Sequence, residues 1–548
     1  MLTLFLALAV LQEPAEHDPR TDYDVMRYDL AFEVDPVEEH LSGLTTVHAV
    51  VTADALAVLQ LDLDHELSVE RVLGEGGGEL NFGQVGDAVY VPFDPPLPKG
   101  ERFAVTVEYA GSPQAENDFS GFHWERTADG SPWITTSCQG LGSSSWWPGK
   151  DSYFHPEDKP DEGTRTTITV PAELYAVTNG RLAGIDDLAD GRRAFRWIHP
   201  YPLETYSVSL NVAPYVVVED ELKMSDGTRV PWIYYVLPEN AEKAAVQFRE
   251  VPELFRIYSD AFGPWPYPES KFGLVETSFW GMEHSTAVAY GSSYPAWCKL
   301  HDEPDRYAGR HKYFDYILVH EVAHEWWGNA VSAESWGHFW IHEGFGTYAE
   351  GVYVERTQGR ERADEYFRDT ARRIRPSARL YRGDDVDSGE AYSGAIYSKG
   401  ACVLNTLRHY VDDDDAWWLA LRTFNERFRY GNATSDDFRV VVEEVCGGDW
   451  AAFFDQWVYG EGQPAVTGSV RVDGDALAVD VEVGASGATS FHVPLDLAWT
   501  EHGEPRSARI WLVPGANRVR VATGGDPADL SVEHLDRVLG RHDVSVEN

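Results

Sequence analysis

Two histidines spaced four residues apart constrain the fold of this chain more than any other feature of its sequence. His320 and His324 enclose Glu321 in an H-E-x-x-H segment. Residues 313–319 contain no proline or glycine, so a helix can run into the segment, and Gly328-Asn329 is predicted to end it. On such a helix, both imidazoles leave the same face about one turn apart.

That geometry suits a single metal ion. Two neutral imidazole nitrogens on one helical face can reach a zinc ion at roughly 2.0–2.1 Å each. Glu321 directly follows the first histidine, where a carboxylate can take a proton from an attacking water molecule. An H-E-x-x-H segment also arises by chance, so the alternative is a pair of surface histidines on an ordinary helix.

The downstream sequence offers a third ligand. Glu343 follows His324 after a gap of 18 residues and comes just after an aromatic run at residues 336–341. Residues 343–350 are predicted to form a second helix, and a buried helix that crosses the first would bring Glu343 to the histidines. Three protein ligands leave one coordination position open, which is typical of a catalytic zinc. We therefore predict one Zn²⁺ per chain.

Other potential ligands lack a suitable spacing. His338 and His342 lie just before Glu343, but an isolated histidine among aromatic residues is usually packed or hydrogen-bonded within the fold. The cysteines show no C-x-x-C spacing, which argues against a zinc ribbon or a redox pair. Free buried thiols are expected, with one disulfide as the alternative; the cysteines are Cys138, Cys298, Cys402 and Cys446.

The 548 residues are too many for one hydrophobic core, so two to four domains are expected. Apolar residues alternate with period two from Tyr23 to about Val218, which predicts an antiparallel β domain. Helical periodicity begins beyond Pro238, and period two returns from about Gln463. The predicted class is multidomain α+β: a leader at 1–18, an N-terminal β-sheet domain at 19–218, a domain with the metal ligands at 219–462 and a C-terminal β domain at 463–548.

Several elements of the middle domain can be predicted from local patterns. A strand is expected from Phe272 to Val275, a loop over 390–394, and a helix that starts at Tyr397. The acidic run 412–415 is predicted to form a solvated turn and a helix N-terminus rather than a calcium site. Further helices are predicted at 241–262, 417–428, 435–445 and 450–458.

Charge and hydropathy limit the partners of the chain. It has 45 basic and 90 acidic residues, a net charge of −45, which argues against binding to nucleic acid or an anionic membrane surface. A cationic substrate is the alternative to a merely solvated acidic surface. Residues 1–11 are apolar and resemble a signal peptide without its basic start, so export to the periplasm or the exterior is predicted, with the cytoplasm as the alternative. No segment is long and apolar enough to be an integral membrane span.

Two further segments carry polar residues that chemistry can use. Trp280-Gly281-Met282-Glu283-His284 follows the predicted strand, and Gln139 lies in a loop rich in glycine and serine. From the residues alone, Glu283 is interpreted as a solvated loop residue and the Gln139 loop as scaffold.

Together these motifs resemble the zinc aminopeptidases of peptidase family M1, over nearly the whole chain after the leader. The resemblance implies a thermolysin-like mixed α/β domain around the metal. His320, His324 and Glu343 match the zinc ligands, and Glu321 matches the general base. Glu350, two turns beyond Glu343, is similar to a carboxylate that orients a ligand histidine.

The resemblance also implies how a peptide with a free N-terminus is held. Glu283 matches the glutamate that binds the α-amine, and Gln139 resembles a second amine contact. Tyr397 matches the tyrosine that stabilises the oxyanion. Gly281 and Met282 lie on the strand that pairs with the substrate backbone.

The chain departs from the family pattern in two respects. The family often has G-x-M-E-N, whereas Trp280 and His284 stand here in place of the first glycine and the asparagine, and Trp280 is expected to narrow the pocket beside the amine. The large helical C-terminal domain of many members has no counterpart in this sequence, which implies a more open cleft that admits long peptides.

The expected activity is removal of the N-terminal residue of a peptide by zinc-assisted hydrolysis. The alternatives are an endopeptidase of the wider H-E-x-x-H group, an epoxide hydrolase side activity as in a bifunctional relative, and a non-catalytic scaffold with the same fold. Motifs set neither the preferred N-terminal residue, which depends on pocket shape, nor the oligomeric state.

Overall fold

The computed structural model describes residues 17–117, 120–151, 158–224, 227–305, 308–375 and 377–547. The predicted leader lies almost entirely outside these residues and stays a prediction. Two compact units are present, Met1–Arg256 with Trp265–Glu325, and Ile257–Pro264 with Trp326–Asn548. No helix in the described part of the chain is both long and apolar enough to cross a membrane.

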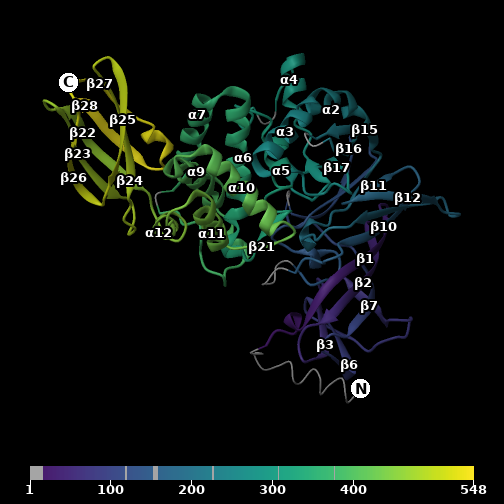
Figure 1. Ribbon diagram of the computed structural model, residues 1–548. Helices are drawn as coiled ribbons and strands as arrows, with labels where there is room; N and C mark the ends of the chain where they lie inside the picture. The colour runs from purple at the N-terminus through teal and green to yellow at the C-terminus, as the bar shows by residue number, and fades with distance from the viewer. Residues whose placement is uncertain are drawn as a thin grey trace. The chain divides into compact units, whose positions relative to one another are not determined.

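The first unit begins with three β-sheets, as the period-two pattern predicts (Figure 1). The largest has the order β12-β13-β10-β1-β2-β7-β4, and the others are β11-β14-β9-β8 and β3-β6-β5. Strand β1 alternates buried and more exposed residues along much of its length, so its inner face lines the core. The strands are β1 (Tyr23–Asp35), β2 (His40–Val51), β3 (Ala55–Asp62), β4 (Ser68–Gly74), β5 (Gly83–Val85), β6 (Ala88–Pro98), β7 (Arg102–Gly111), β8 (Gly121–Arg126), β9 (Pro132–Ser137), β10 (Thr164–Pro171), β11 (Tyr175–Val177), β12 (Arg181–Asp187), β13 (Arg192–His199) and β14 (Asn211–Ala213).

A mixed five-stranded sheet completes the first unit and ends on the shortest of its strands. Its order is β15-β16-β17-β19-β18, with parallel pairing of β16 to β17 and of β17 to β19. Strand β18 lies at the edge, so one side of its backbone is open to pairing. The strands are β15 (Val216–Lys223), β16 (Arg229–Val236), β17 (Phe272–Glu276), β18 (Gly281–Met282) and β19 (Val288–Tyr290). The predicted strand at 272–275 is confirmed as β17.

The helices around this sheet differ in detail from the prediction. The helix expected at 241–262 is split into α2 (Ala241–Gln247) and α3 (Val251–Phe262) by a 3₁₀ turn, because Pro252 lacks an N–H and its ring would clash with a helical carbonyl four residues earlier. The helix α4 (Pro295–His301) follows β19, and α5 (Tyr316–Ala323) carries the H-E-x-x-H segment.

The predicted end of α5 at Gly328-Asn329 is wrong. The helix ends at Ala323, and the amide of Glu325 bonds the carbonyl of Val322 at 3.2 Å in a tighter turn. The chain then turns back, with the Gly328 amide donating to the Val331 carbonyl at 2.8 Å and Gly328 at a φ of +111°. A left-handed glycine therefore serves a reversal rather than a helix cap.

Helices dominate the first part of the second unit. They are α6 (Trp340–Gln358), α7 (Arg360–Ala371), α8 (Ser388–Ala391), α9 (Gly394–Val411), α10 (Asp414–Phe428), α11 (Ser435–Cys446) and α12 (Ala451–Trp457), with the strands β20 (Val331–Ala333) and β21 (Gly431–Ala433) paired in parallel. The helices predicted near 417–428, 435–445 and 450–458 are confirmed as α10 to α12. The acidic run does form a helix start, because the Asp413 side chain accepts from the Ala416 amide at 3.0 Å.

Two local predictions in this unit are wrong. The expected loop at 390–394 overlaps the end of α8, in which the Asp387 side chain accepts from the Glu390 amide at 2.8 Å. Helix α9 begins at Gly394, one turn before the expected start at Tyr397.

Two small sheets end the chain, drawn in yellow-green to yellow in Figure 1, as predicted from the return of period two. Their orders are β26-β23-β22-β28 and β25-β24-β27. The strands are β22 (Pro464–Val472), β23 (Ala476–Ala485), β24 (Val493–Glu501), β25 (Glu504–Leu512), β26 (Gly515–Ala522), β27 (Pro527–Glu533) and β28 (Arg541–Glu547). The α+β class is therefore confirmed, and all four cysteines carry free thiols.

A buried histidine at the end of β13 makes the stability of the first unit depend on pH. His199 packs beside Tyr201 and Tyr267, and neither ring nitrogen has a hydrogen-bond partner among the described residues. Burial, with Lys271 nearby, lowers the pKa of His199 to about 3. Below pH 6.5 the unfolded chain takes up a proton that the folded chain refuses, so the free energy of unfolding falls as the pH falls toward 3.

His199→Phe removes this titration and should flatten the acid limb of the stability curve. We expect the wild type to lose about 2–3 kcal/mol more than the variant between pH 6.5 and 4.5, since one pKa unit corresponds to about 1.4 kcal/mol. Urea unfolding at stepped pH measures both curves, and their slopes above pH 6.5 serve as the internal control. Parallel curves below pH 6.5 would contradict the assignment.

Candidate active site

Helix α5 holds the first two predicted ligands in a fixed, buried position. Every residue of α5 from Ile317 to Ala323 is buried. Asp315 caps the helix by accepting from the Leu318 amide at 3.4 Å, and it also accepts from the Tyr290 hydroxyl of β19 at 2.7 Å. At the other end, Glu325 accepts from the Thr286 amide at 2.7 Å. Hydrogen bonds near both ends of the helix therefore tie it to β19 and to the turn that precedes β19.

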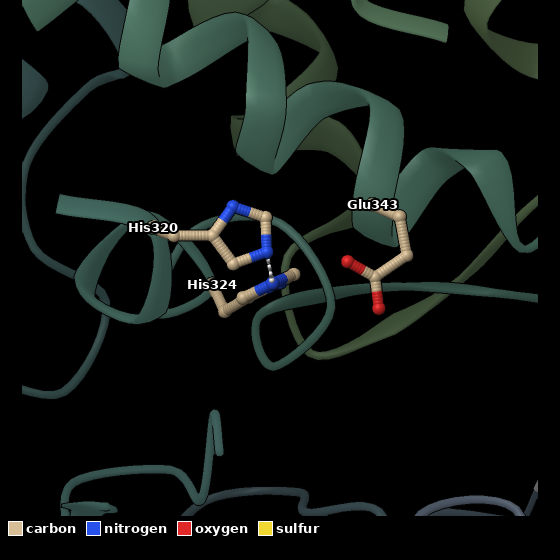
Figure 2. A group of neighbouring side chains, drawn as sticks. All are labelled: His320, His324 and Glu343. Carbon is tan, nitrogen blue, oxygen red and sulfur yellow. Dashed lines mark hydrogen bonds between the residues drawn. The ribbon is translucent and has the colours of Figure 1, made fainter. Parts of the chain in front are cut away.

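The two imidazoles face each other as ligands of one ion would. The Nε2 atoms of His320 and His324 are 3.2 Å apart (Figure 2). Two ligands at roughly 2.0–2.1 Å from a common zinc ion, at a tetrahedral angle, lie about 3.3 Å apart. A carboxylate oxygen of Glu343 completes the group, with all three ligand atoms within 4.8 Å of one another. The donor set of two neutral nitrogens and one carboxylate fits Zn²⁺.

Glu343 is presented by the start of a buried helix. It lies in the first turn of α6, where the helix dipole favours a negative charge. Gly344 follows it, and a Cβ there would come within 2.9 Å of the Gly400 backbone on α9. Helices α6 and α9 therefore cross at glycine contact distance, which fixes where Glu343 points.

The neighbouring histidines are part of the scaffold, as expected. His342 accepts from the Ala333 amide through Nε2 at 3.0 Å. His338 lies 2.9 Å from the Ser435 hydroxyl through Nδ1, and the Trp340 indole donates to the same hydroxyl at 2.8 Å. These bonds hold the entry to α6.

A second polar cluster surrounds Glu283. The Gln139 side-chain amide donates to the Glu283 carboxylate, and the Tyr206 hydroxyl donates to the same oxygen at 3.0 Å. The Gln139 amide is also 3.4 Å from the Tyr206 hydroxyl. Glu283 is only 3% exposed, so the interpretation as a solvated loop residue is wrong.

This cluster adjoins Glu321, the predicted base, and His324, a predicted metal ligand. Carboxylate oxygens of Glu283 and Glu321 and a ring nitrogen of His324 lie within 4.8 Å of one another. Gln139 and Tyr206 thus point their donors at a carboxylate that faces the centre of the site. The prediction from sequence missed Tyr206, which is 77 residues from Glu283 and belongs to no motif.

The edge strand β18 brings Gly281 against the Glu321 carboxylate. A Cβ on Gly281 would lie 2.9 Å from a carboxylate oxygen of Glu321 and 2.8 Å from a methyl carbon of Ile317. Any larger residue at position 281 would crowd the Glu321 carboxylate. Met282 packs in the opposite direction, in a cluster with Tyr206, Phe279 and Ala289.

Four other predicted or flagged residues have the following positions. Tyr397 is half-buried on α9, one turn before the glycine contact with α6. Glu350 accepts from the Tyr366 hydroxyl at 2.7 Å; the roles predicted for Tyr397 and Glu350 stay predictions. His284 is fully buried with a pKa lowered by burial to about 3, so it packs as a neutral ring. Trp280 stacks on Tyr316, with ring centroids 5.3 Å apart.

The His-His-Glu group has the donors of a zinc site, and the chain shares its fold with solved M1 zinc metallopeptidases. Comparison with known families gives one match: residues 246–457 match the model of the Peptidase family M1 domain.

Known aminopeptidases are similar in sequence to this chain. Aminopeptidase M1-C of Oryza sativa subsp. japonica is 24% identical over 502 residues, which are 88% of this chain and 55% of the rice protein. Aminopeptidase N of Lactococcus lactis subsp. cremoris is 27% identical over 286 residues, 49% of this chain and 33% of that protein. The chain spans about half the length of the rice aminopeptidases M1-C and M1-D.

Two solved structures share the fold. A two-domain M1 zinc metallopeptidase, solved as a mutant bound to L-tryptophan, has a TM-score of 0.67 and 24% identity, covering 81% of this chain and 96% of its own. An M1 zinc metallopeptidase from Deinococcus radiodurans, bound to a Tyr-Ser-Ala substrate, has a TM-score of 0.65 and 23% identity, covering 80% and 94%.

Proposed function

We propose that this protein is a zinc-dependent aminopeptidase that removes the N-terminal residue of peptides. The observation that carries the proposal is the buried Glu283 carboxylate, which accepts from Gln139 and Tyr206 and lies within 4.8 Å of Glu321 and His324. A carboxylate so close to the base is suited to bind an ammonium group one residue from the scissile bond.

The residues divide the work of hydrolysis among them. When bound, zinc supplies a Lewis acid that polarises the carbonyl and makes water a stronger nucleophile. Glu321 takes a proton from the attacking water and passes it to the leaving amine. The Tyr397 hydroxyl is assigned to the oxyanion of the tetrahedral intermediate, where one donor typically contributes about 3–4 kcal/mol.

Binding of the chain end limits cleavage to one residue. Glu283 attracts the α-ammonium, and the Gln139 and Tyr206 donors orient that carboxylate. The substrate backbone adds a strand beside β18 at the open edge of its sheet, which aligns the first peptide bond with Glu321. An internal segment of a peptide has no ammonium to offer and loses this contact.

The rival functions differ in what they require at the amine cluster. An endopeptidase needs space there for a preceding residue, whereas Glu283 already bonds two side chains in a buried position. A non-catalytic scaffold needs neither metal nor base. No observation in the described part of the chain favours epoxide hydrolysis.

Acetylation of the substrate N-terminus tests the proposed function. We expect leucyl and arginyl amides with a free amine to be cleaved, and their N-acetyl forms to lose at least about 100-fold in kcat/KM, because the amide can offer no charge to Glu283. Equal cleavage of both forms would instead support the endopeptidase.

A variant of Glu283 tests whether this residue binds the substrate amine. Glu283→Ala should raise KM for free-amine substrates and lower kcat/KM about 10- to 100-fold, the range for loss of a charge-assisted hydrogen bond. Glu269→Gln, an exposed glutamate of the first unit, is the control. A KM for Glu283→Ala equal to that of the control would remove Glu283 from the amine site.

A further inference from the structure

Three aromatic rings and one cation form a stack that begins at the predicted ligand His320. The Tyr316 ring lies over the His320 ring at 5.5 Å and 10°. Trp280 also stacks on Tyr316, with ring centroids 5.3 Å apart and an angle of 27° between the ring planes. The Arg310 guanidinium lies 5.1 Å from the Trp280 ring and 5.7 Å from the Tyr316 ring.

The order of residues from Trp280 to Glu283, a segment that contains β18, indicates on which side of the scissile bond this stack lies. Glu283, which is assigned to the amine, comes two residues after Gly281, whose backbone abuts the base Glu321. Trp280 precedes Gly281. Along the chain it therefore lies on the opposite side of Gly281 from Glu283, which is assigned to the amine. A peptide whose N-terminus is at Glu283 therefore runs past Glu321 toward Trp280 with its leaving-group residues.

Arg310 is a positive charge held at that end. Its side chain is exposed, and it has no ion pair among the described residues. The two aromatic faces favour its position by cation–π attraction. A planar guanidinium fits a carboxylate with two parallel hydrogen bonds.

The reach of the stack corresponds to a short peptide. With 5.5 Å from His320 to Tyr316 and 5.7 Å from Tyr316 to Arg310, the guanidinium lies within about 11 Å of the His320 ring. An extended residue spans roughly 3.3–3.6 Å, so one or two residues beyond the scissile bond bring a terminal carboxylate to Arg310. A longer peptide carries its carboxylate past the cation.

We propose that Arg310, positioned by Trp280 and Tyr316, binds the C-terminal carboxylate of the substrate, so that dipeptides and tripeptides with a free C-terminus are the preferred substrates. This inference rests on the proposed aminopeptidase function. Trp280 stands where the family often has glycine, and the proposal places it on the leaving-group side of the scissile bond. It also replaces the expectation of a cleft suited to long peptides.

The test compares substrates that differ only at the C-terminus. Leu-Ala-Ala and Leu-Ala-Ala-amide are hydrolysed by the wild type, Arg310→Gln and Arg310→Lys, and the ratio of the two kcat/KM values is measured for each. We expect a ratio of at least about 10 for the wild type, an intermediate ratio for lysine, and a ratio near 1 for glutamine, because one charge-assisted contact is worth about a decade or more.

A second cation nearby provides the matched control. Lys312 also lies over an aromatic ring, that of Tyr313 at 4.7 Å, but belongs to no part of the stack. Lys312→Gln should keep the wild-type ratio. Trp280→Gly should lower the ratio, and Trp280→Phe, which keeps a ring under Arg310, should restore most of it.

The outcomes separate this inference from the proposed function. Equal rates on acid and amide in the wild type, or an unchanged ratio in Arg310→Gln, overturn the carboxylate site while the enzyme remains an aminopeptidase. Cleavage of neither peptide, together with no cleavage of aminoacyl amides, overturns the proposed function itself. A ratio that falls equally in Lys312→Gln shows only general charge attraction and also overturns the site.

Discussion

Glu321→Gln is expected to lower kcat for an aminoacyl amide by about 10²- to 10⁴-fold while the protein keeps one zinc per chain. This is the usual contribution of a general base. The amide of glutamine keeps the size of the side chain beside Gly281 but cannot take a proton from water. The ligand atoms of His320, His324 and Glu343 are untouched, so the metal stays. KM should change little, because Glu283 still binds the amine.

Steady-state kinetics and zinc content by mass spectrometry measure this prediction together. Glu334→Gln, an exposed glutamate between the two ligand segments, is the control and should behave as the wild type. Turnover by Glu321→Gln within threefold of the control would remove Glu321 from the role of base. Loss of zinc in the same variant would show that its carboxylate serves the metal instead.

Glu343→Ala is expected to lose both the metal and the activity. Neutral imidazoles of His320 and His324 remain, but two ligands bind zinc far more weakly than three, and the predicted carboxylate ligand is gone. We expect less than about a tenth of a zinc per chain after dialysis. Activity should fall more than about 100-fold, beyond the loss typical of residues that only orient a ligand.

Folding must be separated from metal loss in this variant. Circular dichroism and thermal unfolding of the wild type with a chelator give the reference for a folded protein without zinc. Glu361→Gln, exposed on α7, is the matched control for a lost carboxylate. A folded Glu343→Ala protein with full zinc content would show that another residue is the third ligand.

The part of the site that could be predicted is the part encoded locally. The i, i+4 spacing of His320 and His324 needs only a helix, and a helix is what these residues form. The ends of that helix were less predictable. The side chain of Asp315 caps the start of the helix by accepting from the Leu318 amide. After Ala323 the chain forms a tighter turn and reverses before β20. Neither effect has a strong signature in single-residue propensities.

The rest of the site depends on tertiary contacts between distant segments. Glu283 was interpreted from its own sequence as solvated, yet Gln139 approaches it from a turn 144 residues away and Tyr206 from a 3₁₀ helix 77 residues away. No sequence pattern points to Arg310 or Tyr316, and their proposed role follows from their packing against Trp280. The family resemblance predicted that Glu283 and Gln139 belong to the site. A family motif reflects contacts in a known fold, whereas periodicity reflects only local structure.

The central claim is that His320, His324 and Glu343 hold a single zinc ion, and anomalous diffraction at the zinc absorption edge tests it most directly. Crystals of the purified protein should show one strong peak per chain, at roughly 2.0–2.2 Å from an imidazole nitrogen of each histidine and a carboxylate oxygen of Glu343. No peak at these three side chains in protein that contains zinc, or a peak ligated by other residues, would contradict the account.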